Sequence, residues 1–157
     1  MNPPPESLED LIRASSRAMV IGVGGGGDVV GALAAARFLE FCGLTFVLGG
    51  LSWERSVFDP VPGPRMLSEV ENVRALHPRA WMANRQSQTN TGVFFAESRM
   101  AMIQGKEVLL IDINGAVNGV VEGLEAAMRE FETDLLVGLD VGGDCLAQGN
   151  ERGLRSP

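Results

Sequence analysis

Residues 18–41, AMVIGVGGGGDVVGALAAARFLEF, decide the fold class of this chain. An apolar run at 18–23 leads into four consecutive glycines and then into an alanine- and leucine-rich segment at 29–41. This order predicts a buried strand, a tight loop and a helix, with Asp28 as the helix N-cap and Gly43 just past the helix end. The stretch is typical of the first strand, loop and helix of a Rossmann-like α/β domain.

Further apolar runs repeat this rhythm along the chain. They lie at 44–48, 79–83, 107–113 and 134–139, and helices are expected at 93–104 and 118–131. Near-continuous hydrophobicity suits parallel strands covered on both faces, and alternation with helices implies right-handed crossovers. We therefore expect a three-layer αβα fold with a mostly parallel sheet of about five strands.

The domain organisation follows from where this rhythm begins and where it breaks. Residues 1–17 form a polar N-terminal segment, and residues 18–157 fit a single domain. Residues 49–78 interrupt it with several prolines around one expected helix at 67–76. Such an excursion is either a functional lid or a plain surface loop.

Composition and charge exclude several classes of partner. The net charge of -7 disfavours nucleic acid as the main partner, because phosphate binding needs a basic surface. No uncharged apolar run reaches the length of a membrane helix, and the N-terminus lacks the features of a signal peptide. Cys42 and Cys145 have no CxxC spacing, which favours reduced thiols and a cytoplasmic protein. The expected partner is a small molecule.

The glycine-rich loop is the principal candidate for ligand binding. Residues 22–27 match GxGxxG between a strand and a helix, where backbone amides and the helix N-terminus attract an anion. The candidate ligand residues of this loop are Gly24, Gly25, Gly26, Gly27 and Asp28. A small, phosphorylated ligand is therefore expected.

Two well-known nucleotide sites fit this loop less well. A dinucleotide site needs an acid at the end of the second strand, where this chain has Leu48-Gly49-Gly50, so a NAD-dependent oxidoreductase is only an alternative. Glu54 comes too late in the sequence to replace that acid without special geometry. A P-loop is excluded because Asp28-Val29 stands where Lys-Ser/Thr belongs.

Several aspartates follow predicted strands and suggest a metal site. Asp112, Asp140 and Asp144 lie near the carboxyl ends of the fourth and fifth strands. With Asp28 they form either an acidic cluster suited to Mg²⁺ or a set of separate loop aspartates. His77 is the sole histidine and there is no Cys/His cluster, which argues against zinc.

Two further segments extend the candidate site. Gly142, Gly143 and Asp144 repeat the order Gly26-Gly27-Asp28, and they either bind ligand or merely lead from a strand into a helix. Trp53 follows the second predicted strand and either stacks on a ligand ring or packs in the core.

In combination, four motifs resemble the family known as domain of unknown function 1152, which is mainly archaeal. They are VIGVGGGGDVVGALAAARFLE, LGGLSWER with DPVPGPR, LIDINGAVNGV and LLVGLDVGGDCLAQGNERGLRSP, and the resemblance spans most of residues 18–157. It implies the fold and assigns no reaction. Family members are about twice this length, so the chain is expected to be an N-terminal portion of a longer protein. Two functions stay open: an enzyme-type domain, or a non-catalytic sensing or assembly module that contacts a C-terminal half or forms a homo-oligomer.

Overall fold

The computed structural model describes residues 7–61 and 63–142. The elements, in chain order, are α1 (Leu8–Ala14), β1 (Arg17–Gly22), α2 (Asp28–Phe41), β2 (Thr45–Leu51), the 3-10 turn η1 (Leu67–Glu69), β3 (Val70–His77), β4 (Ala80–Thr89), α3 (Ala96–Gln104), β5 (Val108–Ile111), α4 (Ala116–Phe131) and β6 (Leu135–Leu139). None of the described helices has both the length and the apolar character needed to cross a membrane.

The strands form one mixed, mostly parallel sheet in the order β3-β4-β5-β2-β1-β6. β1 pairs in parallel with both β2 and β6, and β2 pairs in parallel with β5. β4 is antiparallel to β5, and β3 is antiparallel to β4. The expected α/β fold class is therefore confirmed, with six strands in place of about five.

The extra strand is β3, and it corrects the predicted helix at 67–76. Only η1 is helical there, and β3 forms a hairpin with β4 across Pro78. The residue before a proline is biased towards extended backbone, which favours a strand ending at His77. Asn72 has a φ of 58° and lies at a register shift between Glu71 and Val73. This bulge breaks the alternation of polar and apolar residues by which a strand is recognised.

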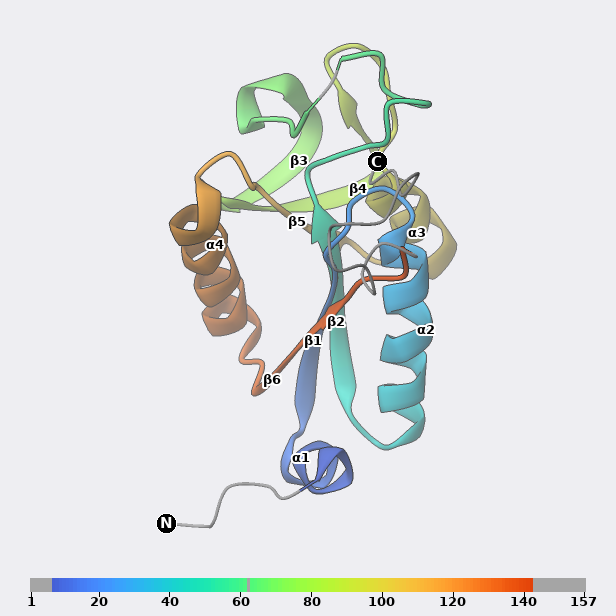
Figure 1. Cartoon of the computed structure of the whole chain (residues 1–157), viewed down its shortest axis with the longest axis vertical. Coiled ribbons are helices and arrows are strands. Elements are labelled where there is room, and N and C mark those ends of the chain that lie inside the picture. Colours follow the sequence, from blue (N-terminus) through green and yellow to red (C-terminus); the bar gives the residue numbers. More distant parts are fainter. Residues whose placement is uncertain (1–6, 62, 143–157) are drawn as a thin grey trace, which may run out of the picture.

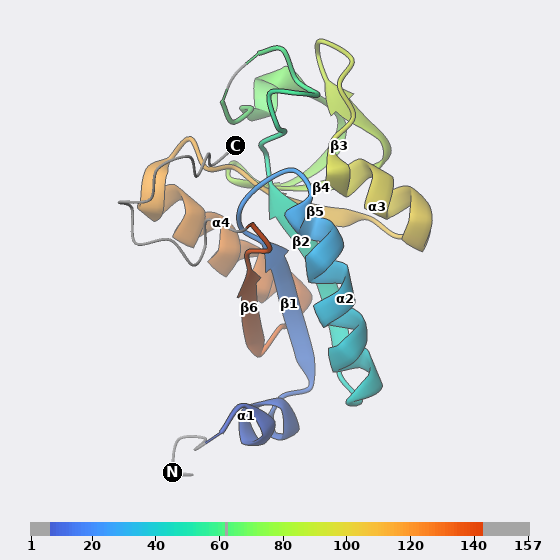
Figure 2. The ribbon, with the colours of Figure 1, turned by 45° about the vertical axis from the view of Figure 1, so that its right-hand side comes forward.

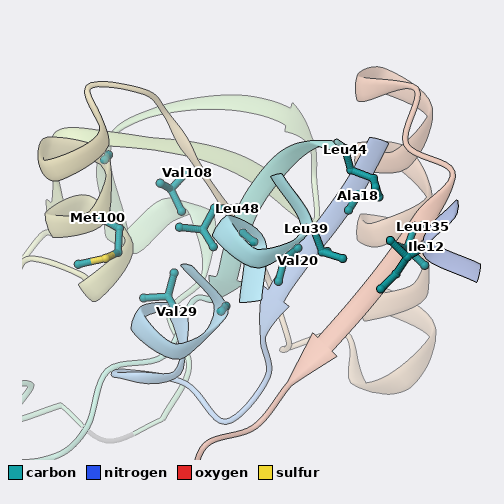
Figure 3. Close-up of a cluster of buried hydrophobic side chains, with 13 residues drawn as sticks. Ile12, Ala18, Val20, Val29, Leu39, Leu44, Leu48, Met100, Val108 and Leu135 are labelled. Carbon is teal, nitrogen blue, oxygen red and sulfur yellow. The ribbon is translucent and has the colours of Figure 1, made fainter. Parts of the chain in front are cut away.

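Helices cover both faces of the parallel part of the sheet, as Figure 1 shows with α2 and α3 on one side and α4 on the other. Ala18 and Val20 of β1 pack in the cluster beneath α2 and α3, which Figure 3 displays. Met19 and Ile21 alternate to the α4 side. All four side chains are buried, because the strand has no solvated face.

The excursion after β2 closes on itself at its base. Ser52 and Arg65 exchange two hydrogen bonds, from Arg65 N–H to Ser52 O at 2.7 Å and from Ser52 Oγ to Arg65 O at 2.9 Å. The Arg65 guanidinium also donates to the buried carboxylate of Asp59, with an Nε to Oδ2 distance of 2.8 Å. A buried ion pair thus holds the loop together from within.

The strand order reverses at β1. From β1 the chain moves outward to β2, forms β3 and β4 at the far edge and comes back to β5, and α4 then returns it to β6 on the other side of β1 (Figure 2). In open α/β sheets, ligands bind beyond the carboxyl ends of the strands at such a reversal. The loops that follow β1 and β6 occupy this position.

Candidate functional site

The glycines of the loop after β1 differ in how much space surrounds them. A Cβ on Gly22 would lie 2.5 Å from the backbone N of Val29, so this turn from strand to helix requires glycine. Gly25 and Gly26 have φ values of 79° and 53°, a region that glycine enters without strain. A Cβ on Gly27 would meet nothing within 4 Å. The loop is therefore tightly packed at its start and open beside Gly27.

Asp28 closes this loop rather than capping the helix, so its predicted role as N-cap is wrong. Gly27 occupies the cap position, and Asp28 is the first residue of α2. The Asp28 carboxylate is turned back and accepts a hydrogen bond from Gly24 N–H at 2.7 Å. A Cβ on Gly24 would lie 2.2 Å from Asp28 Oδ2, so glycine leaves the room that this contact needs. The helix start is thereby tied to the end of β1.

Asp140 approaches the same point from β6. The Cβ position of Gly24 is 3.3 Å from Asp140 Oδ1, which itself accepts a hydrogen bond from Gly142 N–H at 2.7 Å. Burial and then the neighbouring Asp140 raise the pKa of Asp28, although the bond from Gly24 N–H opposes this. Two like charges therefore lie close together at the strand reversal, where a cation or ligand hydroxyl groups would relieve their repulsion.

Trp53 lies against the glycine loop from the end of β2. Its carbonyl oxygen accepts a hydrogen bond from Gly26 N–H at 3.0 Å, and a Cβ on Gly25 would lie 3.7 Å from Trp53 Cγ. Next to it, Arg55 Cγ would lie 2.8 Å from a Cβ on Gly26. The loops after β1, β2 and β6 thus meet at one place.

Two buried acids lie behind this loop: Glu54, which was considered from the sequence only as a replacement for the acid of a dinucleotide site, and Glu97, which was missed. Glu54 accepts a hydrogen bond from Ala96 N–H and so satisfies an amide of the first turn of α3. Glu97, which is 1% exposed, places its carboxyl group over Gly50 of β2. The signal that could have located this approach is the pair Gly49-Gly50 inside a strand, since glycine there often marks a close neighbour.

Burial raises the pKa of both acids. It is the main cause that raises the pKa of Glu54, and the hydrogen bond from Ala96 N–H and the charge of Arg99 oppose it. Burial also raises the pKa of Glu97 well above its ordinary value, and the nearby carboxylates of Glu54 and Asp28 add to the effect. Glu97 Oε2 has no hydrogen-bond partner within the described residues.

Asp112 lies elsewhere along the sheet edge, after β5, with β2 between β5 and β1. Its carboxylate pairs with Arg79 and accepts hydrogen bonds from Asn114 N–H at 2.8 Å and Asn114 Nδ2 at 2.6 Å. Of the three predicted Mg²⁺ ligands that the structure describes, Asp28 and Asp140 lie together and Asp112 lies apart from them. Across residues 7–61 and 63–142, no group of three or more His, Cys, Asp or Glu side chains is arranged to hold a metal ion. Gly143 and Asp144 lie outside the described residues.

Comparison of the sequence with protein families assigns the chain to a family. Residues 19–157 match the family described as "Protein of unknown function (DUF1152)", which covers the glycine loop and both neighbouring loops. The chain belongs to the DUF1152 family. No curated protein and no solved structure matches the chain.

The site of this DUF1152 domain offers complementary polar groups. Gly27 is exposed, and its N–H donates to no acceptor within the described residues, so it is accessible to an anion. Asp28 and Asp140 supply carboxylate oxygens beside it. The arrangement can therefore hold an anionic group together with a cation or sugar hydroxyls.

Proposed function

We propose that this domain binds a phosphorylated metabolite or nucleotide together with Mg²⁺ at the reversal between β1 and β6. The observation that supports it is the placement of the exposed Gly27 amide beside the neighbouring carboxyl groups of Asp28 and Asp140. Mg²⁺ is usually bound through one or two carboxylates and the phosphates of its ligand, so this pair suffices without a third acid.

Each group then has a distinct part in binding. The exposed amide of Gly27 contacts a phosphate oxygen at the start of α2, where the helix dipole adds favourable charge. Asp28 and Asp140 would hold the Mg²⁺, which would supply positive charge next to the phosphates of the ligand. Trp53 provides an aromatic face beside Gly25 for the remainder of the ligand. Such binding is compatible both with an enzyme and with a non-catalytic ligand sensor.

The test is isothermal titration calorimetry with ATP, ADP and ribose 5-phosphate, each with and without MgCl₂. We expect at least one of these probes to bind, and to bind more tightly with Mg²⁺. Asp28→Asn should weaken the Mg²⁺-dependent binding about tenfold or more, the loss typical of a hydrogen bond to a charged group. If none of the probes binds the wild type under either condition, the proposal fails.

A second variant separates ligand contact from loop stability. The structure leaves open space where Gly27→Ala would add a methyl group, so this variant should fold as the wild type does while obstructing a ligand on the loop. Glu125→Gln serves as the control, because Glu125 is exposed on α4. Unchanged affinity in both Gly27→Ala and Asp28→Asn would place the ligand elsewhere.

A further inference from the structure

A second polar cluster lies at the carboxyl edge of the sheet, away from the glycine loop. It is built where the β3–β4 turn meets the end of β5, and it comprises His77, Arg79 and Asp112. These side chains line a cleft of about 550 Å³, whose lining also includes the apolar side chains of Met66, Leu67 and Leu76. Charged and apolar side chains thus share one cleft.

Arg79 is held in a fixed position by groups on two sides. Its Nη1 donates to Asp112, which is buried and kept in place by Asn114. On the other side, the N-cap glycine of α4 and a glycine of its first turn make room for it: a Cβ on Gly115 would lie 3.0 Å from Arg79 Cζ, and one on Gly119 would lie 3.5 Å from Nε. The guanidinium is therefore oriented before any ligand arrives.

The same guanidinium retains unused hydrogen-bonding capacity. The Arg79 side chain is 35% exposed, and its remaining N–H groups donate to no side chain or backbone oxygen among the described residues. Arginine presents planar donors that suit carboxylate and phosphate oxygens. The buried Asp112 orients the guanidinium, and the exposed part of the guanidinium remains available to an anion.

His77 adds a second donor to the cleft. Its Nδ1 accepts a hydrogen bond from Arg79 N–H at 3.2 Å, which assigns the hydrogen of the neutral ring to Nε2. Nε2 then serves as a donor to a ligand oxygen in the cleft that His77 and Arg79 share.

The cleft contains positive charge even though the chain carries a net charge of -7. Arg79 lies beside the first turn of α4, which has no acidic residue and no side-chain cap. The partial positive charge of a helix N-terminus therefore adds to that of the guanidinium. The charge of Asp112 is already satisfied by three hydrogen bonds, one from Arg79 and two from Asn114.

We infer that this cleft is a binding site for a small organic oxyanion, with Arg79 and His77 contacting its carboxylate or phosphate and the walls at Met66, Leu67 and Leu76 covering an apolar body. The site is separate from the one proposed at the glycine loop, so either can fail without the other. No covalent step is involved.

Because His77 is the only histidine of the chain, its ring signals give an unambiguous NMR reporter. The probes are phenyl phosphate, benzoate and inorganic phosphate, titrated into the full chain. We expect saturable shifts of the His77 signals with at least one aromatic probe, and tighter binding of that probe than of inorganic phosphate. The preferred aromatic probe identifies the anionic group. Failure of both aromatic probes to shift the His77 signals saturably at millimolar concentration would overturn the inference.

Variants then test the role of Arg79. Arg79→Met should weaken binding of the aromatic probe about tenfold or more, because it removes a charge-assisted contact. Arg74→Met is the matched control, since Arg74 is exposed on β3 and pairs with Glu107 outside the cleft. Should Arg79→Met fail to fold, Ser68→Glu places a negative charge at the exposed rim of the cleft and should weaken binding likewise. Wild-type affinity in a folded Arg79→Met, or in Ser68→Glu, would contradict the inference.

Discussion

The carboxyl group of Glu97 occupies the space above Gly50 that a side chain on β2 would fill. A Cβ on Gly50 would lie 1.8 Å from Glu97 Oε1, so α3 can place its acid against the sheet only because this position is glycine. β2 lacks a side chain at this position, and α3 fills the space with a buried carboxyl group.

Gly50→Ala should therefore destabilise the protein. The added methyl group displaces the buried Glu97 carboxyl group, and overpacking of this kind costs about 1–3 kcal/mol. Urea unfolding followed by circular dichroism measures the loss. Gly138→Ala is the control within a strand, because its Cβ would make only an ordinary contact at 3.4 Å with Val23. Equal effects of the two substitutions would argue against the packing of Glu97 on Gly50.

Glu97→Gln should stabilise the protein at neutral pH. Because the folded-state pKa of Glu97 is raised well above 4.5, the folded protein holds a proton that the unfolded chain releases, and stability falls as pH rises above that value. Glutamine is neutral at every pH and escapes this loss. Unfolding free energies measured from pH 4 to pH 8 should show a gap that widens with pH in favour of the variant. A gap independent of pH would contradict the assignment.

Removing one partner of the ion pair between Asp59 and Arg65 should destabilise the protein. Both side chains are buried, with Arg65 2% exposed, so Arg65→Met leaves an uncompensated carboxylate and should cost about 3–5 kcal/mol. The double variant Asp59→Leu with Arg65→Met should recover much of this loss. Arg129→Met, which removes an exposed pair with Glu125, should change stability by no more than about 1 kcal/mol. Chemical denaturation of the four proteins provides the comparison.

Asp28→Asn and Asp134→Asn should change stability in opposite directions. The pKa of Asp28 is raised from 3.8, so its charge costs stability as pH rises above that value, and asparagine should raise the melting temperature at pH 7. The pKa of Asp134 is lowered by hydrogen bonds from Arg17 N–H and Ser16. Its charge therefore contributes stability above pH 3.8 that is lost as pH falls through its folded-state pKa, and asparagine should lower the melting temperature at pH 7.

The effect at Asp28 should shrink as the pH is lowered towards 3.8, and the effect at Asp134 should shrink as the pH falls below 3.8 towards its lowered folded-state pKa. Thermal unfolding across this range provides the measurement. A destabilised Asp28→Asn at pH 7 would mean that its hydrogen bond to Gly24 outweighs both its burial and its repulsion from Asp140.

The sequence was most informative where local pattern and burial agree. The strand at 18–23 and the helix at 29–41 were predicted from hydrophobicity and the intervening glycines, and they appear as β1 and α2. β3 was missed because the bulge at Asn72 disrupts its alternation. Asp28 was assigned as an N-cap because caps are judged from neighbours in sequence, whereas its carboxylate binds Gly24 N–H on the near side of the loop.

The candidate sites depend on contacts that span the chain, and these were harder to predict. Glu54 meets Ala96 across 42 residues, and Arg79 meets Asp112 across 33, in each case because tertiary packing brings two elements together. Neither pairing can be predicted from residues that are neighbours in the sequence. The pair of Asp28 and Asp140 was within reach, because both follow strands that end at the same edge of a parallel sheet.

The bulge at Asn72 also bears on how the molecule behaves at high concentration. β3 is the outermost strand on its side of the described sheet, and an unpaired outer strand is a template for pairing with another chain. A register shift and the exposed charges of Glu71 and Arg74 make this rim a poor template. The irregularity that hid β3 from sequence reasoning thus helps to keep separate molecules from joining edge to edge into aggregates.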